Sequence, residues 1–398
     1  MRTHKNTRWF LAAGAALLTA TIPVPFAACA AAAPTPAQQP PPPGQPVDRP
    51  FEIVRLDPGL DAVISADAKP ELLAEGFGLT EGPVWVPQRS SRDSHAADPG
   101  GYLLFSDLIS NVIYKWTPGG EVTVFLEKAG YSGEDINNAG TQTRRGRMAV
   151  LLIGPNGETL DSQGRLVWCA SPDGTILRLE NDGTRTVLAD KYQGKRFNGP
   201  NDLVIRSDGA LYFTDSDFGL RGSAKSPQKE LAFNGVYLVR NRQATLLVDD
   251  RQLGGPPNGI TLSPDERYLY LSAGFTKMMR YEVRPDGTLG AGTVFFQGGE
   301  GIVDGMKTDR QGNLYSTGGA GPGAIRVSSP EGRHLGTIHL PVSSKEPRQQ
   351  VCATNLAFGD ADARSLYITA CTALYRIRVK IPGVMPGPHA PTSERHTP

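Results

Sequence analysis

The chain has 398 residues, 20% of them charged, and its formal net charge at pH 7 is +1. This balance excludes the basic surface that binding to nucleic acid or to an anionic membrane requires, so we expect a small-molecule partner. Helix signals are almost absent, which favours an all-β protein.

The first 33 residues have the layout of a secretory signal. Basic residues precede an apolar run over residues 9–20, and small residues follow through Ala33. The apolar run is shorter than the ~20 residues that span a bilayer, and Pro23 interrupts the region, so we expect no membrane span. We predict export to the periplasm or the medium, with lipoprotein anchoring at Cys29 as the alternative.

A Pro-rich segment follows over residues 34–51 and contains the sequence PTPAQQPPPPGQPVDRP. Such a composition forms an extended spacer and cannot bury a core. We assign the globular domain to residues 52–382 and a disordered tail to residues 383–398.

Six repeated units occupy this domain, and each contains two β-rich runs separated by small or polar residues. Turn sequences such as RSDG at Arg206 and RPDG at Arg284 lie between strand signals, because Asp starts a turn and Gly tolerates positive φ. The units start roughly 45 to 63 residues apart, which suits propeller blades better than the shorter solenoid repeats. The sequence therefore predicts a six-bladed β-propeller with four-stranded antiparallel blades. The strand signals begin at Gly101, Gly164, Gly209, Arg267, Gly312 and Arg364.

A polar residue with a side-chain oxygen recurs at one phase of the repeat. Residues at the same phase of a radial repeat point at the same axis, so we expect these oxygens to converge. Each asparagine taken alone indicates only a turn, as in Pro257-Asn258-Gly259, and the shared phase is what argues for a site. The six residues are Glu81, Asn156, Asn201, Asn258, Asp304 and Asn355.

Carboxylate and amide oxygens suit a hard divalent cation. Glu81 and Asp304 would neutralise its charge, while Asn201 and Asn258 would add neutral carbonyls and leave positions for water and substrate. We predict one divalent ion, with Ca²⁺ favoured over Mg²⁺, Mn²⁺ or Zn²⁺.

Histidine and cysteine chemistry is disfavoured. None of the six histidines falls at the repeated polar position, so we expect neither a Ser-His-Asp triad nor a His-rich zinc site. Cys352 and Cys371 flank the hairpin of the sixth unit and form the plausible disulfide pair. Cys169 lies in the apolar run LVWCAS, which indicates a small buried side chain.

Several motifs together resemble the SMP-30/gluconolactonase/LRE-like family, whose six-bladed propellers include gluconolactonases. By this resemblance the divalent metal falls to Glu81, Asn201, Asn258 and Asp304, and the expected activity is lactone hydrolysis. Related propellers, the paraoxonases among them, use a similar calcium site for lactones and organophosphates. The motifs are TEGPVW, RFNGPNDLVIRSDGALYFTD, PPNGITLSPDERYLYLS, VDGMKTDRQGNLY, and TNLAFGD followed by SLYITA.

The chain departs from the family pattern where substrate is expected to sit. Gly199 stands where animal members carry an arginine, two residues before the asparagine of the ND pair. Residues 169–171 are Cys-Ala-Ser where bacterial members often have EHG or QHG, and Asp217 replaces a proline of FTDPPYG. These changes concern the substrate pocket rather than the metal ligands.

The predicted reaction is opening of a sugar lactone such as gluconolactone. The metal would polarise the ester carbonyl, and water would attack it. Asp304 and Asp215 are the candidate general bases, because both should approach the axis. Asp202, beside Asn201, is expected to have a structural role near the metal ligands. Predicted substrate contacts are Asn156, Asn201, Asn355 and Asp217.

Two other functions suit the same ring of oxygens. A phosphotriesterase-like hydrolase would use the same metal on a different ester, and a non-catalytic propeller would hold a structural Ca²⁺ while binding a ligand. In each case we expect a monomer or a small homo-oligomer.

Overall fold

A computed structural model describes residues 49–88, 100–136, 139–144, 148–274, 276–298, 302–318, 323–342 and 352–388. These residues belong to one compact unit, Pro46–Pro398. The predicted signal segment and most of the predicted Pro-rich linker lie outside the described residues. Within the described ranges, no helix is long and apolar enough to cross a membrane.

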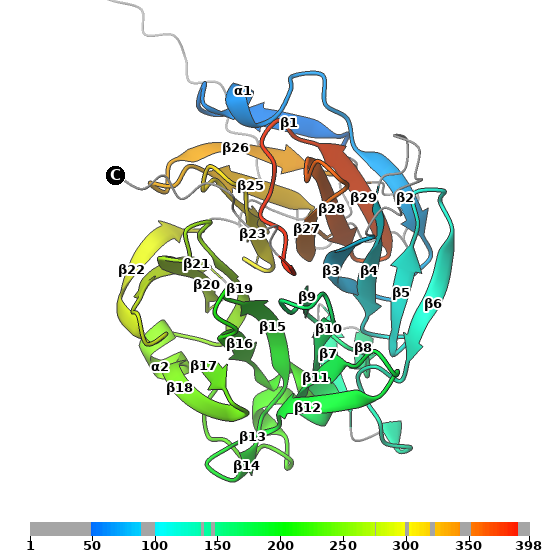
Figure 1. The fold of residues 1–398 in the computed structure, drawn as a ribbon, viewed down its shortest axis with the longest axis vertical. Coiled ribbons are helices and arrows are strands. Elements are labelled where there is room, and N and C mark those ends of the chain that lie inside the picture. The colour runs from blue at the N-terminus through cyan, green and yellow to red at the C-terminus, as the bar shows by residue number, and fades with distance from the viewer. Residues whose placement is uncertain are drawn as a thin grey trace, which may run out of the picture. The chain divides into compact units, whose positions relative to one another are not determined.

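Six antiparallel sheets surround a central axis, which confirms the predicted six-bladed propeller (Figure 1). In each blade the first strand lies at the axis and the later strands follow outward. The first three blades are β3 (Thr80–Pro87), β4 (Gly101–Asp107), β5 (Val112–Trp116) and β6 (Val122–Glu127); β9 (Glu158–Leu160), β10 (Leu166–Ala170), β11 (Thr175–Leu179) and β12 (Arg185–Ala189); and β15 (Pro200–Ile205), β16 (Leu211–Asp215), β17 (Gly235–Arg240) and β18 (Gln243–Asp249).

The last two blades recruit strands from the N-terminal side of the domain, which closes the ring of blades. Strand β1 (Glu52–Arg55) pairs with the outer strand of the fifth blade, and β2 (Glu71–Glu75) completes the sixth. The remaining blade strands are β19 (Pro257–Leu262), β20 (Tyr268–Ala273), β21 (Lys277–Val283) and β22 (Leu289–Gln297); β23 (Met306–Thr308), β24 (Leu314–Thr317), β25 (Ala324–Ser328) and β26 (His334–His339); and β27 (Asn355–Gly359), β28 (Ser365–Ala370) and β29 (Ala373–Arg378).

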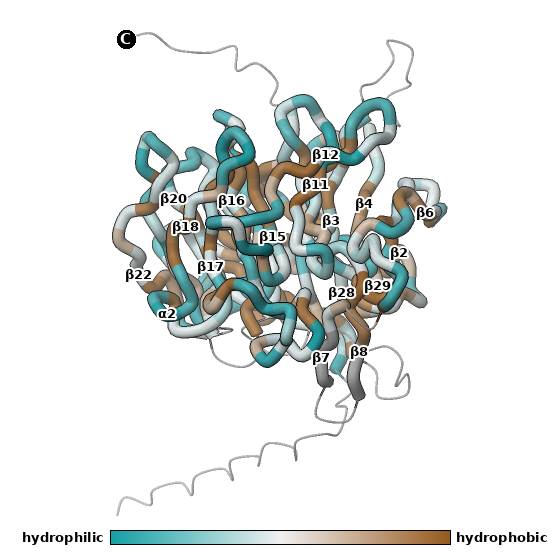
Figure 2. Tube along the Cα trace, turned by 90° about the horizontal axis from the view of Figure 1, so that it is seen from below, coloured by the Kyte–Doolittle hydropathy of each residue, from teal (hydrophilic) through white to brown (hydrophobic). Residues whose placement is uncertain are grey.

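Short elements connect strands within and between the blades. Figure 2 shows hydrophobic residues along the strands and hydrophilic residues at the turns, as expected for blades that pack face to face. The connecting elements are the hairpins β7 (Gly140–Arg144) with β8 (Met148–Leu152) and β13 (Lys191–Tyr192) with β14 (Lys195–Arg196), the one-turn helices α1 (Leu60–Val63) and α2 (Asp250–Leu253), and the 3₁₀ turns η2 (Ser171–Asp173), η3 (Asp217–Gly219) and η4 (Ser223–Lys225).

The hydrophobic core lies between neighbouring blades. Trp85 of the first blade stacks on Tyr367 of the sixth, with ring centroids 5.4 Å apart, and both side chains are fully buried. Such aromatic contacts across blades stabilise the closed ring. Cys352 and Cys371 form the expected disulfide, with a Cα–Cα distance of 5.2 Å, and Cys169 is a free, buried thiol.

Residues 382–388, which we call the C-terminal strap, pack against the propeller. The sequence predicts a disordered tail from residue 383 onward. The backbone N–H of Val384 donates to Thr308 O (3.0 Å), and Met385 packs against two core clusters. A side chain at Gly383 has no room, because its Cβ would lie 1.8 Å from the Phe358 ring. The apolar residues within this Pro- and Gly-rich segment explain the difference, since they cover apolar surface near the axis (Figure 1). Residues 389–398 lie outside the described part of the chain.

Candidate functional site

The six polar residues at the repeated phase all lie at or just before the start of an axial strand. Four of them are the first or second residue of an axial strand: Glu81 in β3, Asn201 in β15, Asn258 in β19 and Asn355 in β27. Asn156 and Asp304 lie two residues before β9 and β23. We refer to these six residues as the ring. Five of them are buried and Asp304 is half-buried.

Glycine after a ring residue allows neighbouring axial strands to approach each other. A Cβ on Gly82 would lie 2.1 Å from the Asn156 carbonyl oxygen, and a Cβ on Gly259 would lie 2.1 Å from the Asp304 carbonyl oxygen. No side chain fits at such distances. The Glu-Gly and Asn-Gly pairs of the sequence are therefore requirements of strand packing at the axis, not simple turn signals.

Hydroxyl groups on the second strands fix the backbone near the ring. In three blades, a serine or threonine donates to a carbonyl at the start of the next blade's axial strand. These bonds hold neighbouring blades in register, so the ring geometry is set by the scaffold. They join Ser106 Oγ to Asn156 O (2.7 Å), Thr214 Oγ1 to Asn258 O (2.6 Å) and Thr317 Oγ1 to Thr354 O (2.7 Å).

Acidic side chains come together across the axis. Asn355 Nδ2 donates to Glu81 Oε2 (3.1 Å) and lies 3.5 Å from Asp202 Oδ2. Asp304 experiences the charges of both Glu81 and Asp202 and receives a hydrogen bond from the Asn258 side chain. The structure thus connects two of the predicted metal ligands, Glu81 and Asp304, and adds Asp202 as a third carboxylate.

Burial and mutual repulsion make this cluster costly to ionise. Burial raises the pKa of Glu81 to about 7, and the nearby charge of Asp202 adds to the shift while Lys307 opposes it. Burial also raises the pKa of Asp304 well above its usual value, with further contributions from Glu81 and Asp202. A positive charge placed among these carboxylates would relieve the repulsion.

The donor atoms fit a hard divalent cation. They are carboxylate and amide oxygens: Asn258 bonds the Asp304 side chain, Asn201 adjoins Asp202 in the sequence, and the buried acidic charge calls for a cation. Among the described residues, no three His, Cys, Asp or Glu side chains form a metal-binding group of their own. The predicted ligand set depends instead on two carboxylates assisted by amides.

A small pocket of about 10 Å³ lies beside the ring. Asn156 and Asn201 line it, together with Ser171, Gly199 and Phe218. Ser171 and Gly199 are positions at which the sequence departs from the family pattern, so those departures do border the pocket. Asn355, also predicted to contact substrate, faces the carboxylates instead.

Asp217, another predicted substrate contact, is turned away from this pocket. The residue is 6% exposed, and its carboxylate pairs with Lys229 Nζ at 3.2 Å and accepts from Asn234 Nδ2 at 3.4 Å. Its neighbour Phe218 lines the pocket, and sequence reasoning missed this residue. An apolar residue at the centre of a turn, here Phe218 between Asp217 and Gly219, could have indicated a pocket wall.

Asp215 supports a loop. Its two carboxylate oxygens accept from the backbone N–H groups of Asn198 (3.0 Å) and Gly199 (2.7 Å), and the residue is fully buried. Asp107 of the first blade binds Gly78 and Leu79 in the same way. Burial raises the pKa of Asp215 to about 6. Its predicted role as general base stays a prediction.

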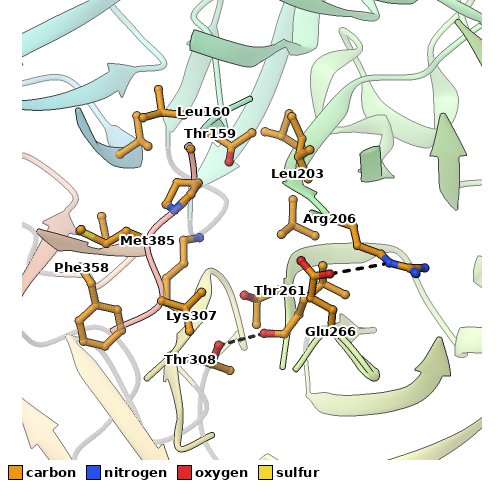
Figure 3. Close-up of a pocket in the computed structure, with 18 of the residues that line it drawn as sticks. Thr159, Leu160, Leu203, Arg206, Thr261, Glu266, Lys307, Thr308, Phe358 and Met385 are labelled. Carbon is orange, nitrogen blue, oxygen red and sulfur yellow. Dashed lines mark hydrogen bonds and ion pairs between the residues drawn. The ribbon is translucent and has the colours of Figure 1, made fainter. Parts of the chain in front are cut away.

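A larger cavity of about 350 Å³ lies farther along the axial strands, beneath the strap (Figure 3). Thr159, Thr261 and Lys307 line it, and each is three residues beyond a ring position. Figure 3 shows Lys307 extending into the cavity beside Met385. The repeat phase could have identified these three residues, which sequence reasoning missed.

Glu158 is a further buried acid beside this cavity. The residue is 3% exposed, and its Oε1 accepts from Ser106 Oγ at 2.6 Å. Its Oε2 has no hydrogen-bond partner within the described structure. Burial raises its pKa well above the usual range, which favours the neutral form of the carboxyl.

Comparison with known proteins gives relatives along most of the chain. The gluconolactonase of Zymomonas mobilis subsp. mobilis is 34% identical over 343 residues, which cover 83% of this chain and 86% of that protein. Regucalcin of Xenopus laevis is 29% identical over 308 residues, which cover 76% of this chain and 87% of that protein.

Solved structures show the same propeller. A gluconolactonase from Xanthomonas campestris has a TM-score of 0.63 and 29% identity, and the match covers 86% of this chain and 99% of that one. A sequence profile of the SMP-30/Gluconolactonase/LRE-like region matches residues 79–372, a span that includes every ring residue from Glu81 to Asn355. The chain therefore belongs to the SMP-30/Gluconolactonase/LRE-like family.

Proposed function

We propose that the protein is a divalent-metal-dependent lactonase that opens a sugar lactone such as gluconolactone. The observation that carries this proposal is the buried acidic cluster at the start of the axial strands, where Glu81, Asp202 and Asp304 repel one another. Identity of 34% to a gluconolactonase over most of the chain supports the substrate class.

The ring residues would divide the work of holding the ion. Glu81 and Asp304 supply charge, and Asn201 and Asn258 supply amide oxygens. When bound, a divalent ion polarises an ester carbonyl and stabilises the negative charge that develops on its oxygen. Ca²⁺ suits this oxygen-only donor set best.

The protein's side chains would orient the lactone and accept the proton of the attacking water. Asn156 and Ser171 face the small pocket and can bind substrate hydroxyl groups. Asp304 is the preferred general base, because it lies in the acidic cluster where the ion would bind, within reach of the charges of Glu81 and Asp202. Asp215 is less suited, since both of its oxygens already accept backbone N–H groups.

Metal-stripped protein tests the proposal. Hydrolysis of glucono-δ-lactone is measured above the spontaneous rate after separate addition of Ca²⁺, Mg²⁺, Mn²⁺ and Zn²⁺, with a phosphotriester assayed in parallel. We expect lactone hydrolysis to vanish on chelation and to return with Ca²⁺. Full activity in the chelated protein would refute the metal-dependent reaction, and turnover of the phosphotriester alone would assign the site to that ester class.

We also propose that the enzyme acts outside the cytoplasm. The signal-like segment over residues 1–33 supports this location, and the Cys352–Cys371 disulfide suits an oxidising compartment. Fractionation of cells that express the full chain should recover a shortened protein in the periplasm or the medium. Recovery of the uncut chain in the cytoplasm would contradict the proposed location.

A further inference from the structure

Lys307 lies between the ring and the larger cavity. It follows Asp304 by three residues in β23, and its half-buried side chain lines the cavity (Figure 3). Its Nζ is 3.5 Å from Asn355 Oδ1, and its charge acts on Glu81.

Lys307 contributes, with Leu356 and Glu81, to the orientation of the Asn355 amide. Asn355 Oδ1 accepts from Lys307 Nζ and from the backbone N–H of Leu356 (2.8 Å), while Nδ2 points to Glu81 Oε2. The opposite orientation would place an amide oxygen against a carboxylate and an NH₂ group against an ammonium. The hydrogen-bond network therefore fixes the orientation.

We propose that Lys307 is a positioning residue that limits how tightly the ring binds a divalent cation. Its fixed positive charge repels the ion, and its hold on Asn355 withholds an amide oxygen that would otherwise be available as an additional ligand. Both effects weaken binding and keep coordination positions open for water and substrate. This inference rests on the proposed metal-dependent function.

Calorimetric titration of Ca²⁺ into metal-free protein tests the role of Lys307. We expect Lys307→Met to bind Ca²⁺ about tenfold or more tightly than the wild type, and Lys307→Arg to retain the wild-type affinity. Lys277→Met is a matched control, because Lys277 is also half-buried but lies in β21, away from the axis. Its Nζ donates to the backbone carbonyl of Leu253 (2.7 Å). The control variant should bind Ca²⁺ like the wild type.

Lys307→Gln separates the two effects and provides a second variant if Lys307→Met fails to fold. Glutamine keeps a donor for Asn355 Oδ1 but lacks the charge, so tighter binding by this variant would support the electrostatic effect. Unchanged or weaker Ca²⁺ binding by folded Lys307→Met and Lys307→Gln would overturn the inference while leaving the proposed function intact. A wild-type protein that binds no divalent cation would overturn both.

Discussion

The two ends of the axial strands differ in chemistry. At their starts, carboxylates and amides crowd together, and glycine allows the strands to approach; farther along, Thr159, Thr261 and Leu160 line a mainly apolar cavity that the strap covers. The same blades support both ends. A repeat can thus carry reactive groups at one phase because the rest of each strand packs in the core.

The largest effect should come from the acidic end. Asp304→Asn removes a negative charge and a potential base, and we expect a loss of lactone hydrolysis of about 10³-fold, equivalent to about 4 kcal/mol in the barrier. Steady-state kinetics with saturating Ca²⁺ measures this loss. Glu158→Gln, at the cavity end, is the matched control and should retain activity within a fewfold range. Equal losses in both variants would remove the distinction between the two ends.

Asp215 should affect stability more than catalysis, with the effect depending on pH. Its folded-state pKa of about 6 exceeds the unfolded value of 3.8, so its protonation stabilises the fold fully below pH 3.8. That contribution, about 3 kcal/mol from the pKa difference, is lost as pH rises through 6. Unfolding free energies of wild type and Asp215→Asn, measured between pH 3.5 and 7.5, should therefore differ by an amount that changes across this window.

A constant stability difference across the pH range would contradict the buried titration of Asp215. Asp304→Asn is not a suitable comparison here, because the charges of Glu81 and Asp202 also affect the pKa of Asp304. Asp107→Asn is more informative, since Asp107 binds the corresponding loop of the first blade through Gly78 and Leu79. Loss of lactonase activity in Asp215→Asn without loss of folding would support its predicted role as general base.

The strap provides the corresponding test at the cavity end. Met385→Ala removes half-buried apolar surface that packs on two core clusters, so we expect a loss of about 1–2 kcal/mol in unfolding free energy. Denaturant unfolding measures this, while kcat/KM of the folded enzyme should stay near the wild-type value. A large loss of activity at unchanged stability would mean that the strap communicates with the ring.

The sequence was sufficient for features that follow the repeat. Turn residues and alternating apolar runs specify the blades locally, and the shared phase of residues such as Glu81 and Asn258 places them at the axis. The position of Asp217 was not predictable, because its partner Lys229 comes from a loop whose path no local pattern specifies. The strap was missed for a related reason: Met385 and Gly383 acquire their meaning from surface contributed by distant blades.

The smallest expected effect concerns the wall of the ring-side pocket. Phe218 borders this pocket, and the ion pair of Asp217 with Lys229 holds the turn that carries it. Phe218→Ala should favour bulkier lactones over gluconolactone by up to about tenfold in relative kcat/KM, because about 1.4 kcal/mol of differential packing is involved. Lys229→Met should change this ratio in the same direction by a smaller factor, whereas Phe125→Ala on β6 should leave it unchanged. An unaltered ratio in Phe218→Ala would place substrate elsewhere, and the cavity beneath the strap would become the site to test.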